Sequence, residues 1–348
     1  MRFYERRARR ILPALFAVVL LASIAASWLL TPQQYKMFAK SVFATALFAS
    51  NILFWIESSY FDLAATTKPL LHTWSLAVEE QFYIVLPMFL VIIHHWLKGR
   101  YIAWLVPIAV LSFAASVWGV AHEPSATFYL APTRAWELAL GSLLALDAFP
   151  QLQQRLWLEL AGLLGLVLVA WGVFAFTYTT PFPGTNALFP AVGAALVIYS
   201  GRGCETTIGK VLGLRPLVFI GLISYSLYLW HWPLLVFAQV WYVDELTAAE
   251  KGIIVILSFI LAVLSWRFVE LPFRRPAGVV RRMPLFGGAA AAITCFALFG
   301  LFGYLSQGWP SRFPSRVRTI AAAIDDWEFP NGLSIVVSVA PAPFTRRA

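Results

Sequence analysis

Charged residues are scarce in this chain of 348 residues, at 12% of the sequence. Soluble domains carry about 25% Asp, Glu, Lys and Arg. Hydrophobic residues instead make up 60%, and the mean hydropathy is +0.74. The shortage of charge excludes an ordinary soluble domain and predicts an all-α, polytopic bundle of membrane helices.

Cysteine is also scarce, because the chain holds only Cys204 and Cys295. The two lie far apart, without the spacing of a zinc or redox motif, so we expect no disulfide framework and no metal site. The sequence likewise lacks a P-loop, a dinucleotide-binding fingerprint, an internal repeat of convincing period and a cleavable signal peptide. The sequence therefore shows no motif of the common nucleotide-binding classes.

The basic residues that are present, which give a net charge of +9, gather in short loops between apolar runs. This pattern follows the positive-inside rule, so we expect the lipid bilayer and not nucleic acid as the partner. The amino-terminal arginines and the basic loops define a cytoplasmic side. The basic loops are 98–100, 202–215 and 274–282, and the loops with few or no basic residues are 121–133, 177–186 and 241–250.

Nine apolar runs are expected to span the membrane, and residues 1–305 are expected to form one membrane domain. The runs are 11–30, 75–96, 102–120, 135–148, 156–176, 187–200, 217–240, 252–269 and 285–305. If a further segment, 39–56, also crossed the membrane, the basic loops that follow would lie on the opposite side from the amino-terminal arginines. We therefore interpret this segment as re-entrant or interfacial. Pro13 falls in the first turn of the first span, where its missing amide proton costs little. Residues 306–348 are expected to form an extracytoplasmic linker or disordered tail.

The most polar stretch next to a span runs from His72 to Pro87. A carboxylate at a helix centre in the bilayer costs roughly 2.5–3.5 kcal/mol, so Glu79 and Glu80 should face a protein or water-filled interior. On a helix, Tyr83 lies one turn from Glu79, and the three side chains can line one cavity. Two interpretations stay open: a functional cavity, or an interfacial belt of acids and aromatic residues. The histidine and the adjacent acids favour the cavity, and Pro87 is expected to bend the helix.

Four further places can carry chemistry. Arg6, Arg7, Arg9 and Arg10 occupy neighbouring helical positions and suit phosphate, because guanidinium groups donate paired hydrogen bonds. Their alternative role is to fix the orientation of the first span. Glu270 can act as a general acid or base or bind a donor group, or it can simply pair with Arg267 or Arg274.

His231 lies between two tryptophans within an apolar run. It needs a hydrogen-bond partner there, and Ser224 and Tyr228 lie near its helical face, so a structural role is favoured over a catalytic one. Arg134 and Glu137 are three residues apart and are expected to pair with each other. His94 and His95 are expected at the interface.

Five stretches together resemble the integral-membrane acyltransferase 3 family, whose members O-acylate bacterial surface glycans. They occur in the family's order, across residues 3–305. The stretches are Phe3–Ala14, Leu71–Tyr83, Arg134–Gly141, Ile223–Pro233 and Phe268–Arg274.

The resemblance implies transfer of an acyl group, typically O-acetyl, from acetyl-CoA to a surface or secreted glycan such as the lipopolysaccharide O-antigen. It also implies a place in the bacterial inner membrane, with the amino terminus and the transiently bound donor on the cytoplasmic side and the tail outside. Arg7 and Arg10 match the family's Arg-x-x-Arg element, with Arg6 beside them, and would hold the phosphates of coenzyme A. Glu270 matches the family's functional glutamate.

His72, Glu79 and Glu80 are the further catalytic candidates. Members of the family begin with two additional spans, the first of which holds an arginine and a histidine that look essential, and this chain starts after them. Neither His72 nor His231 is therefore assigned the family's catalytic histidine.

The segment from Gly308 resembles the linker to an outer hydrolase-like domain of the SGNH type, so we expect a chain truncated at both ends and of doubtful activity. The alternative function is a polytopic transporter or flippase. In that case the intramembrane acids and His231 would form a substrate or ion path.

Overall fold

The structure, a computed structural model, describes residues 2–58, 67–152, 154–177, 179–202, 205–242, 245–274, 282–313 and 315. Within these ranges it is helical and contains no strand, which confirms the all-α prediction. Cys204 and most of the predicted tail, 306–348, lie outside the described residues.

The helices follow one another along the chain with short connections. They are α1 (Arg2–Leu29), α2 (Pro32–Ala46), α3 (Ser50–Ser58), α4 (Thr73–Trp96), α5 (Tyr101–His122), α6 (Pro124–Tyr129), α7 (Ala135–Ala145), α8 (Arg155–Ala175), α9 (Leu188–Ser200), α10 (Thr207–Leu212), α11 (Arg215–Trp241), α12 (Ala248–Ser265), the π-helical turn η4 (Trp266–Glu270), α13 (Leu271–Arg274) and α14 (Arg282–Leu305).

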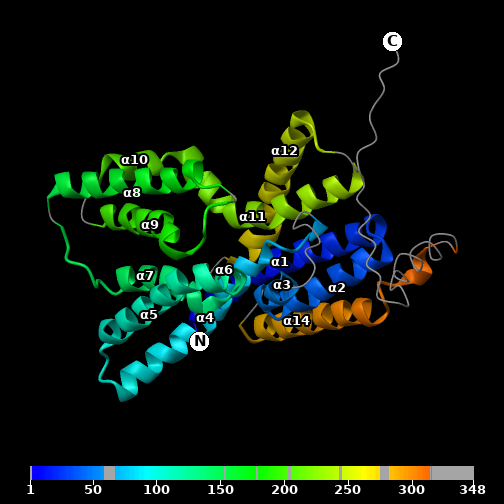
Figure 1. Cartoon of the computed structure of the whole chain (residues 1–348), viewed down its shortest axis with the longest axis horizontal. Coiled ribbons are helices and arrows are strands. Elements are labelled where there is room, and N and C mark those ends of the chain that lie inside the picture. Colours follow the sequence, from blue (N-terminus) through cyan, green and yellow to red (C-terminus); the bar gives the residue numbers. More distant parts are fainter. Residues whose placement is uncertain are drawn as a thin grey trace, which may run out of the picture.

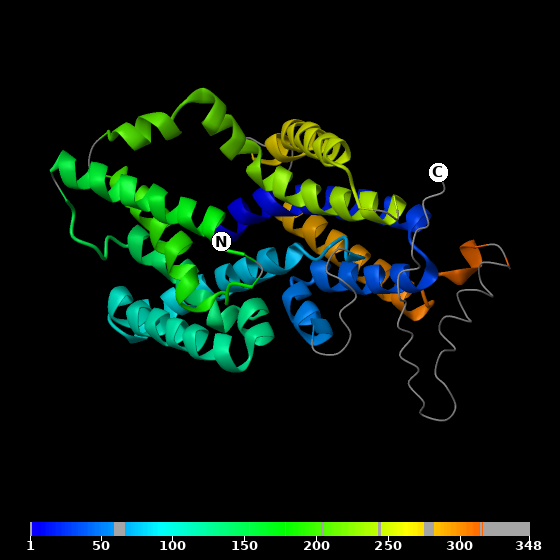
Figure 2. The same ribbon diagram turned by 45° about the horizontal axis from the view of Figure 1, so that its top comes forward.

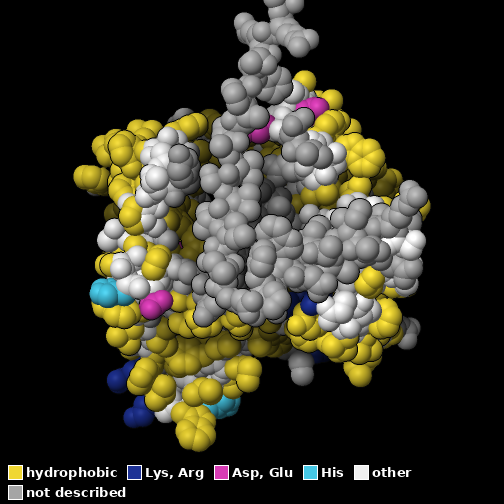
Figure 3. Space-filling model, turned by 45° about the vertical axis from the view of Figure 1, so that its right-hand side comes forward, with side chains coloured by type: hydrophobic (Ala, Val, Ile, Leu, Met, Phe, Trp, Pro, Cys, Tyr) yellow, Lys and Arg dark blue, Asp and Glu magenta, His cyan; other side chains and the backbone are white. Residues whose placement is uncertain are grey.

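Seven helical stretches of the described chain are long and apolar enough to cross a bilayer. They are α1, α4, α5, α8, α11, α12 with its continuation to Arg274, and α14. The predicted spans 135–148 and 187–200 correspond to shorter apolar helices, Ala135–Ala145 and Gly184–Ser200. Many of the large apolar side chains along α8 and α12 face outward, and hydrophobic atoms cover much of the face in Figure 3. The fold is that of a polytopic membrane bundle.

The 39–56 segment does not form a continuous helix. It is divided between α2 and α3 by residues 47–49, where Phe48 adopts a positive φ of 52°. Thr31 and Gln34 form a capping box that starts α2, and α2 then packs along α14 while α3 packs against α4. The break agrees with the interpretation of this segment as something other than a full span.

The expectation for Pro13 is wrong. The helix α1 already begins at Arg2, so Pro13 lies in its interior and not in its first turn. The arginine-rich start consists of good helix formers, and Glu5 pairs with Arg9 one turn later at 3.0 Å, so the helix extends back from the apolar run. Pro87 is also interior, and α4 continues past it to Trp96.

The helices form two groups that lie beside each other (Figures 1 and 2). The first contains α4, α5 and α7–α10, with α8 packed along α9. The second contains α1, α2, α11, α12 and α14, with α2 packed along α14 and α11 along α12. Side chains that cross from one group to the other therefore determine how the two groups sit together.

Close backbone contact holds α2 against α14. A Cβ atom at Gly300 would lie 2.5 Å from the Phe43 nitrogen and 2.6 Å from the Ala39 oxygen. Beyond the end of α14, Arg312 returns to α1 and α2: its guanidinium donates to the carbonyls of Ser27 and Leu30, both at 2.7 Å, and lies 4.1 Å from the Tyr35 ring centroid. The carboxyl end of α14 is thus attached to the ends of two other helices.

Gly300→Ala should destabilise the bundle by about 1–3 kcal/mol, because the methyl group meets backbone atoms that cannot move independently. The matched control is Gly287→Ala in the same helix, where an added Cβ has no neighbour within 4 Å. Thermal unfolding of the purified protein in detergent measures both. Equal midpoints for the two variants would contradict the close contact between α2 and α14.

Candidate functional site

Arg7 on α1 bridges the paired acids of α4. Its Nη2 lies 3.0 Å from Glu79 Oε1 and 2.5 Å from Glu80 Oε1, and its Nε lies 3.5 Å from Glu80 Oε2. The guanidinium carbon also sits 3.5 Å from the centroid of the Tyr83 ring. The predicted grouping of Glu79, Glu80 and Tyr83 is confirmed, and its centre is an arginine from the other group of helices.

The helical spacing of α4 explains why these side chains meet. Tyr83 follows Glu79 by one turn, and the Tyr4 hydroxyl donates to the Ile84 carbonyl at 2.9 Å, which fixes α1 against the same face. One guanidinium group pairs with two carboxylates, so the cluster has one negative charge in excess when both acids are ionised. Arg7 and Glu80 are largely shielded, with 20% and 11% of their side chains exposed, whereas Glu79 is 44% exposed.

Beside this cluster lies a cavity of about 280 Å³ between α1, α4 and α14. Arg7, Glu80 and Tyr83 form its polar side. The remaining lining is apolar and includes Ile11 and Phe286. Arg6 and Arg10 lie elsewhere on α1, one turn apart and exposed, and neither makes an ion pair within 4 Å among the described residues.

Glu270 lies in the π-helical turn η4 and is fully buried. The Ser226 hydroxyl on α11 donates to its Oε1, and Arg274 Nη1 lies 3.5 Å from its Oε2. Arg10 is the other positive group within electrostatic range of this carboxylate. The expected ion pair with Arg274 is present, and Ser226 is a partner that the sequence did not reveal.

Two tyrosines, one turn apart on α11, connect these clusters. The Tyr225 hydroxyl donates to the Ile11 carbonyl at 3.0 Å, and its ring lies within electrostatic range of both Glu80 and Glu270. The Tyr228 hydroxyl donates to the His72 carbonyl and lies 2.9 Å from the Ser75 hydroxyl. The helix α11 therefore runs between Glu270 and the start of α4.

His72 does not join Glu79 and Glu80 at Arg7. It lies beside Tyr228 and His231 of α11 instead. Its ring centroid lies 5.2 Å from that of Tyr228 and 5.9 Å from that of His231, and neither ring nitrogen has a hydrogen-bond partner among the described residues. His72 immediately precedes the span that begins at Thr73. Burial, together with the nearby His231, lowers the pKa of His72 to about 3, and the Leu229 backbone opposes this shift. The ring is therefore neutral at physiological pH.

His231 is exposed, and its Nδ1 lies 3.2 Å from the Leu227 carbonyl. The expected partner among Ser224 and Tyr228 is wrong, because the Ser224 hydroxyl donates to the Gly221 carbonyl and the Tyr228 hydroxyl to the His72 carbonyl. A backbone bond of this kind is open to any helical histidine, which is why the sequence could not distinguish it.

The remaining candidates have local explanations. Arg134 pairs with Glu137 at 3.0 Å as expected, and His94 and His95 are exposed. A network that the sequence did not indicate joins Glu57 to Lys40 and Lys68, each at 3.2 Å. Its members come from three separate segments.

The sequence of the whole chain was compared with known proteins. The family model of the acyltransferase domain matches residues 1–267. The chain belongs to the acyltransferase 3 family. No solved structure matches the chain.

The curated relatives are named as O-acetyltransferases. The peptidoglycan O-acetyltransferase of Listeria monocytogenes is 30% identical over 290 residues, which cover 78% of this chain and 46% of that protein. A putative peptidoglycan O-acetyltransferase of Bacillus subtilis is 31% identical over 288 residues, or 78% of this chain and 45% of that protein. A putative O-acetyltransferase of Staphylococcus aureus is 31% identical, with 78% of this chain and 47% of that protein covered. The chain thus spans about half the length of these relatives.

Arg7→Ala should destabilise the protein by about 3 kcal/mol, because it leaves the shielded carboxylate of Glu80 unpaired beside Glu79. Adding Glu80→Gln to Arg7→Ala should recover part of the loss, since it removes one of the unpaired charges. The control is Arg155→Ala, whose pair with Glu159 is exposed and is expected to contribute little. Unfolding midpoints in detergent decide the matter, and equal losses for Arg7→Ala and Arg155→Ala would refute a structural role for the cluster.

A second prediction concerns pH. The folded state lowers the pKa of His72 to about 3 from 6.5, so the unfolded chain binds a proton that the folded chain excludes. The stability linked to this group is complete above pH 6.5 and is lost as the pH falls toward 3, by up to about 1.4 kcal/mol per unit. Unfolding midpoints between pH 7.5 and 5 should therefore fall less steeply for His72→Gln than for the wild type. His122→Gln, which alters an exposed histidine, should keep the wild-type slope, and an unchanged slope in His72→Gln would disprove the assignment.

Proposed function

We propose that this chain is the membrane part of an O-acetyltransferase that transfers an acetyl group from acetyl-CoA to a hydroxyl group of a cell-wall glycan. Membership of the family and the names of the relatives support the reaction class. The observation that carries the proposal is the pair of exposed guanidinium groups on α1, Arg6 and Arg10, of which Arg10 lies within electrostatic range of the buried carboxylate of Glu270.

The donor is assigned to the arginine-rich start of α1. Coenzyme A carries several phosphates, and arginine binds phosphate through paired, charge-assisted hydrogen bonds. Arg6 and Arg10 are one turn apart and are not engaged in ion pairs among the described residues, so they are the phosphate ligands in this proposal. Arg7 already serves Glu79 and Glu80, and its role is to position α1 for the donor.

The transfer needs a base. The oxygen of the hydroxyl group that first accepts the acetyl group attacks the thioester carbonyl, a C–O bond forms, the C–S bond breaks and the thiolate of coenzyme A leaves, while that hydroxyl group gives up its proton. In this proposal Glu270 receives that proton, because it lies within electrostatic range of Arg10 and its orientation is held by Ser226 and Arg274. Glu79, Glu80 and His72 then serve to hold α4 against α1 and α11.

The acceptor is proposed to be peptidoglycan. Two of the relatives are named for that glycan, which favours it over the O-antigen that the family resemblance first suggested. The positive-inside pattern favours the bacterial cytoplasmic membrane, with α1 beginning at the cytoplasmic face and the segment after α14 outside. The donor would then be met on the side where acetyl-CoA is made, and the acetyl group would pass from its first acceptor to peptidoglycan on the outer side.

Arg10→Ala should weaken acetyl-CoA binding about tenfold, or roughly 1.4 kcal/mol, because one charge-assisted contact to phosphate is lost. Binding of radiolabelled acetyl-CoA to membranes that contain the protein provides the measurement, and Arg155→Ala is the control arginine. Glu270→Gln should retain donor binding and lose transfer. Loss of binding in Glu270→Gln would instead assign this carboxylate to positioning Arg10.

The acceptor is tested in cells that carry the full-length gene, against a deletion strain, by mass spectrometry of peptidoglycan and of other surface glycans. Loss of O-acetyl groups from peptidoglycan alone is the expected result. Unchanged glycans, together with donor binding that ignores Arg10 and with substrate flux across the membrane, would favour a transporter or flippase.

A further inference from the structure

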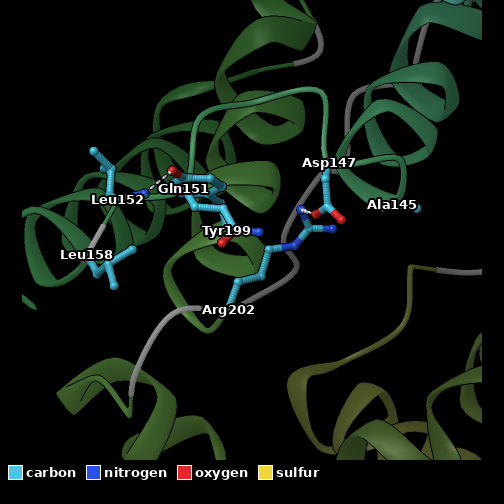
Figure 4. Close-up of a pocket in the computed structure, with 7 residues that line it drawn as sticks. All are labelled: Ala145, Asp147, Gln151, Leu152, Leu158, Tyr199 and Arg202. Carbon is cyan, nitrogen blue, oxygen red and sulfur yellow. Dashed lines mark hydrogen bonds and ion pairs between the residues drawn. The ribbon is translucent and has the colours of Figure 1, made fainter. Parts of the chain in front are cut away.

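A cavity of about 610 Å³ lies where the end of α7, the start of α8 and the end of α9 meet, away from the residues assigned to acetyl transfer. Figure 4 shows the guanidinium of Arg202 turned toward the carboxylate of Asp147, with Tyr199, Gln151 and Leu152 on the opposite side. The site therefore combines one cation, one anion and an amide around a single space.

The two charges of this cavity are adjacent and balanced. Arg202 Nη1 lies 3.0 Å from Asp147 Oδ1, and both side chains remain partly accessible, at 32% and 65%. Two neighbouring pairs of charges, Arg155 with Glu159 and Lys210 with Glu205, are separate from it. Among the described residues that line the cavity, Arg202 is the cation and Asp147 the anion, so the site favours a ligand that presents both signs of charge.

A second cavity, of about 340 Å³, adjoins the first. Its lining is apolar and comes from one face of α7, with Leu140 and Leu144, and one face of α9, with Val192 and Leu196. Leu152 and Tyr199 line both cavities, so the polar and apolar spaces meet there.

The junction between the cavities is held in place by hydrogen bonds. The Tyr199 hydroxyl donates to the Pro150 carbonyl and accepts from the Leu152 amide at 3.0 Å. These two bonds fix the orientation of the phenol group, which lies between the polar cavity and the apolar cavity. Phe149 and Leu152, each 38% exposed, extend the apolar surface around this junction.

We propose that these joined cavities bind one zwitterionic aminophospholipid. Its phosphate pairs with Arg202, its primary ammonium group pairs with Asp147, and an acyl chain occupies the groove between α7 and α9. The charge pair matches the two charges of such a headgroup in sign, and the apolar cavity gives the chain a place outside water. This assignment does not depend on the acetyl-transfer proposal, because it uses none of the same residues.

Titration of the purified full chain with defined phospholipids, followed by native mass spectrometry, tests the site. Phosphatidylethanolamine should bind at least tenfold more tightly than phosphatidylglycerol, which has no ammonium group. Asp147→Asn should abolish this preference, and asparagine suits the positive φ of 51° at that position. Arg202→Gln should weaken binding of both lipids, and Arg155→Gln should change neither.

Two further measurements separate the headgroup from the chain. Leu196→Trp, which fills the apolar cavity, should lower binding of every phospholipid, and glycerophosphoethanolamine, which has no acyl chains, should bind far more weakly than the intact lipid. Equal binding of the two headgroups by the wild type would overturn the proposal, as would a preference that survives Asp147→Asn. Equally strong binding of glycerophosphoethanolamine would reduce the site to one for a soluble zwitterion. Displacement of the lipid by an acyl-CoA would also overturn it, because that ligand is polyanionic.

Discussion

A single guanidinium shared by two carboxylates joins the two groups of helices. Arg7 belongs to the group that contains α1, and Glu79 and Glu80 belong to the group that contains α4. In a mostly apolar bundle, each of these charges would be costly alone, so the ion cluster specifies which face of α1 meets which face of α4. Once that register is fixed, Tyr225 reaches Ile11 and Tyr228 reaches His72.

This arrangement also divides the arginines of α1 by task. Four of them look equivalent in the sequence, but Arg7 faces α4 and Arg9 pairs with Glu5, while Arg6 and Arg10 point elsewhere. A helix turns by about 100° per residue, so a short basic run necessarily distributes its side chains over several faces. Charge density in a sequence therefore overstates the number of groups that remain available to a ligand.

The sequence predicted most of the helices and part of the site. Apolar length identified the spans, and the spacing of four residues correctly brought Glu79 together with Tyr83, because both are local properties of the chain. The partner of Glu80 was not predictable, since Arg7 is far away in sequence and helix spacing says nothing about which helix lies opposite. For the same reason His72 was grouped with the acids that follow it, although α11 draws its ring toward His231. The position of Pro13 within its helix was predicted wrongly, because the apolar run marks the membrane crossing and not the beginning of the helix.

The π-helical turn at Trp266–Glu270 has a consequence for how this protein can change over evolution. A π turn holds one more residue than an α turn, so the loss of a single residue there would restore regular winding and shorten the chain at little cost to the backbone. The same deletion would remove the widened turn that holds the carboxylate of Glu270 beside Ser226. Insertions and deletions in this short stretch should therefore be far rarer than substitutions.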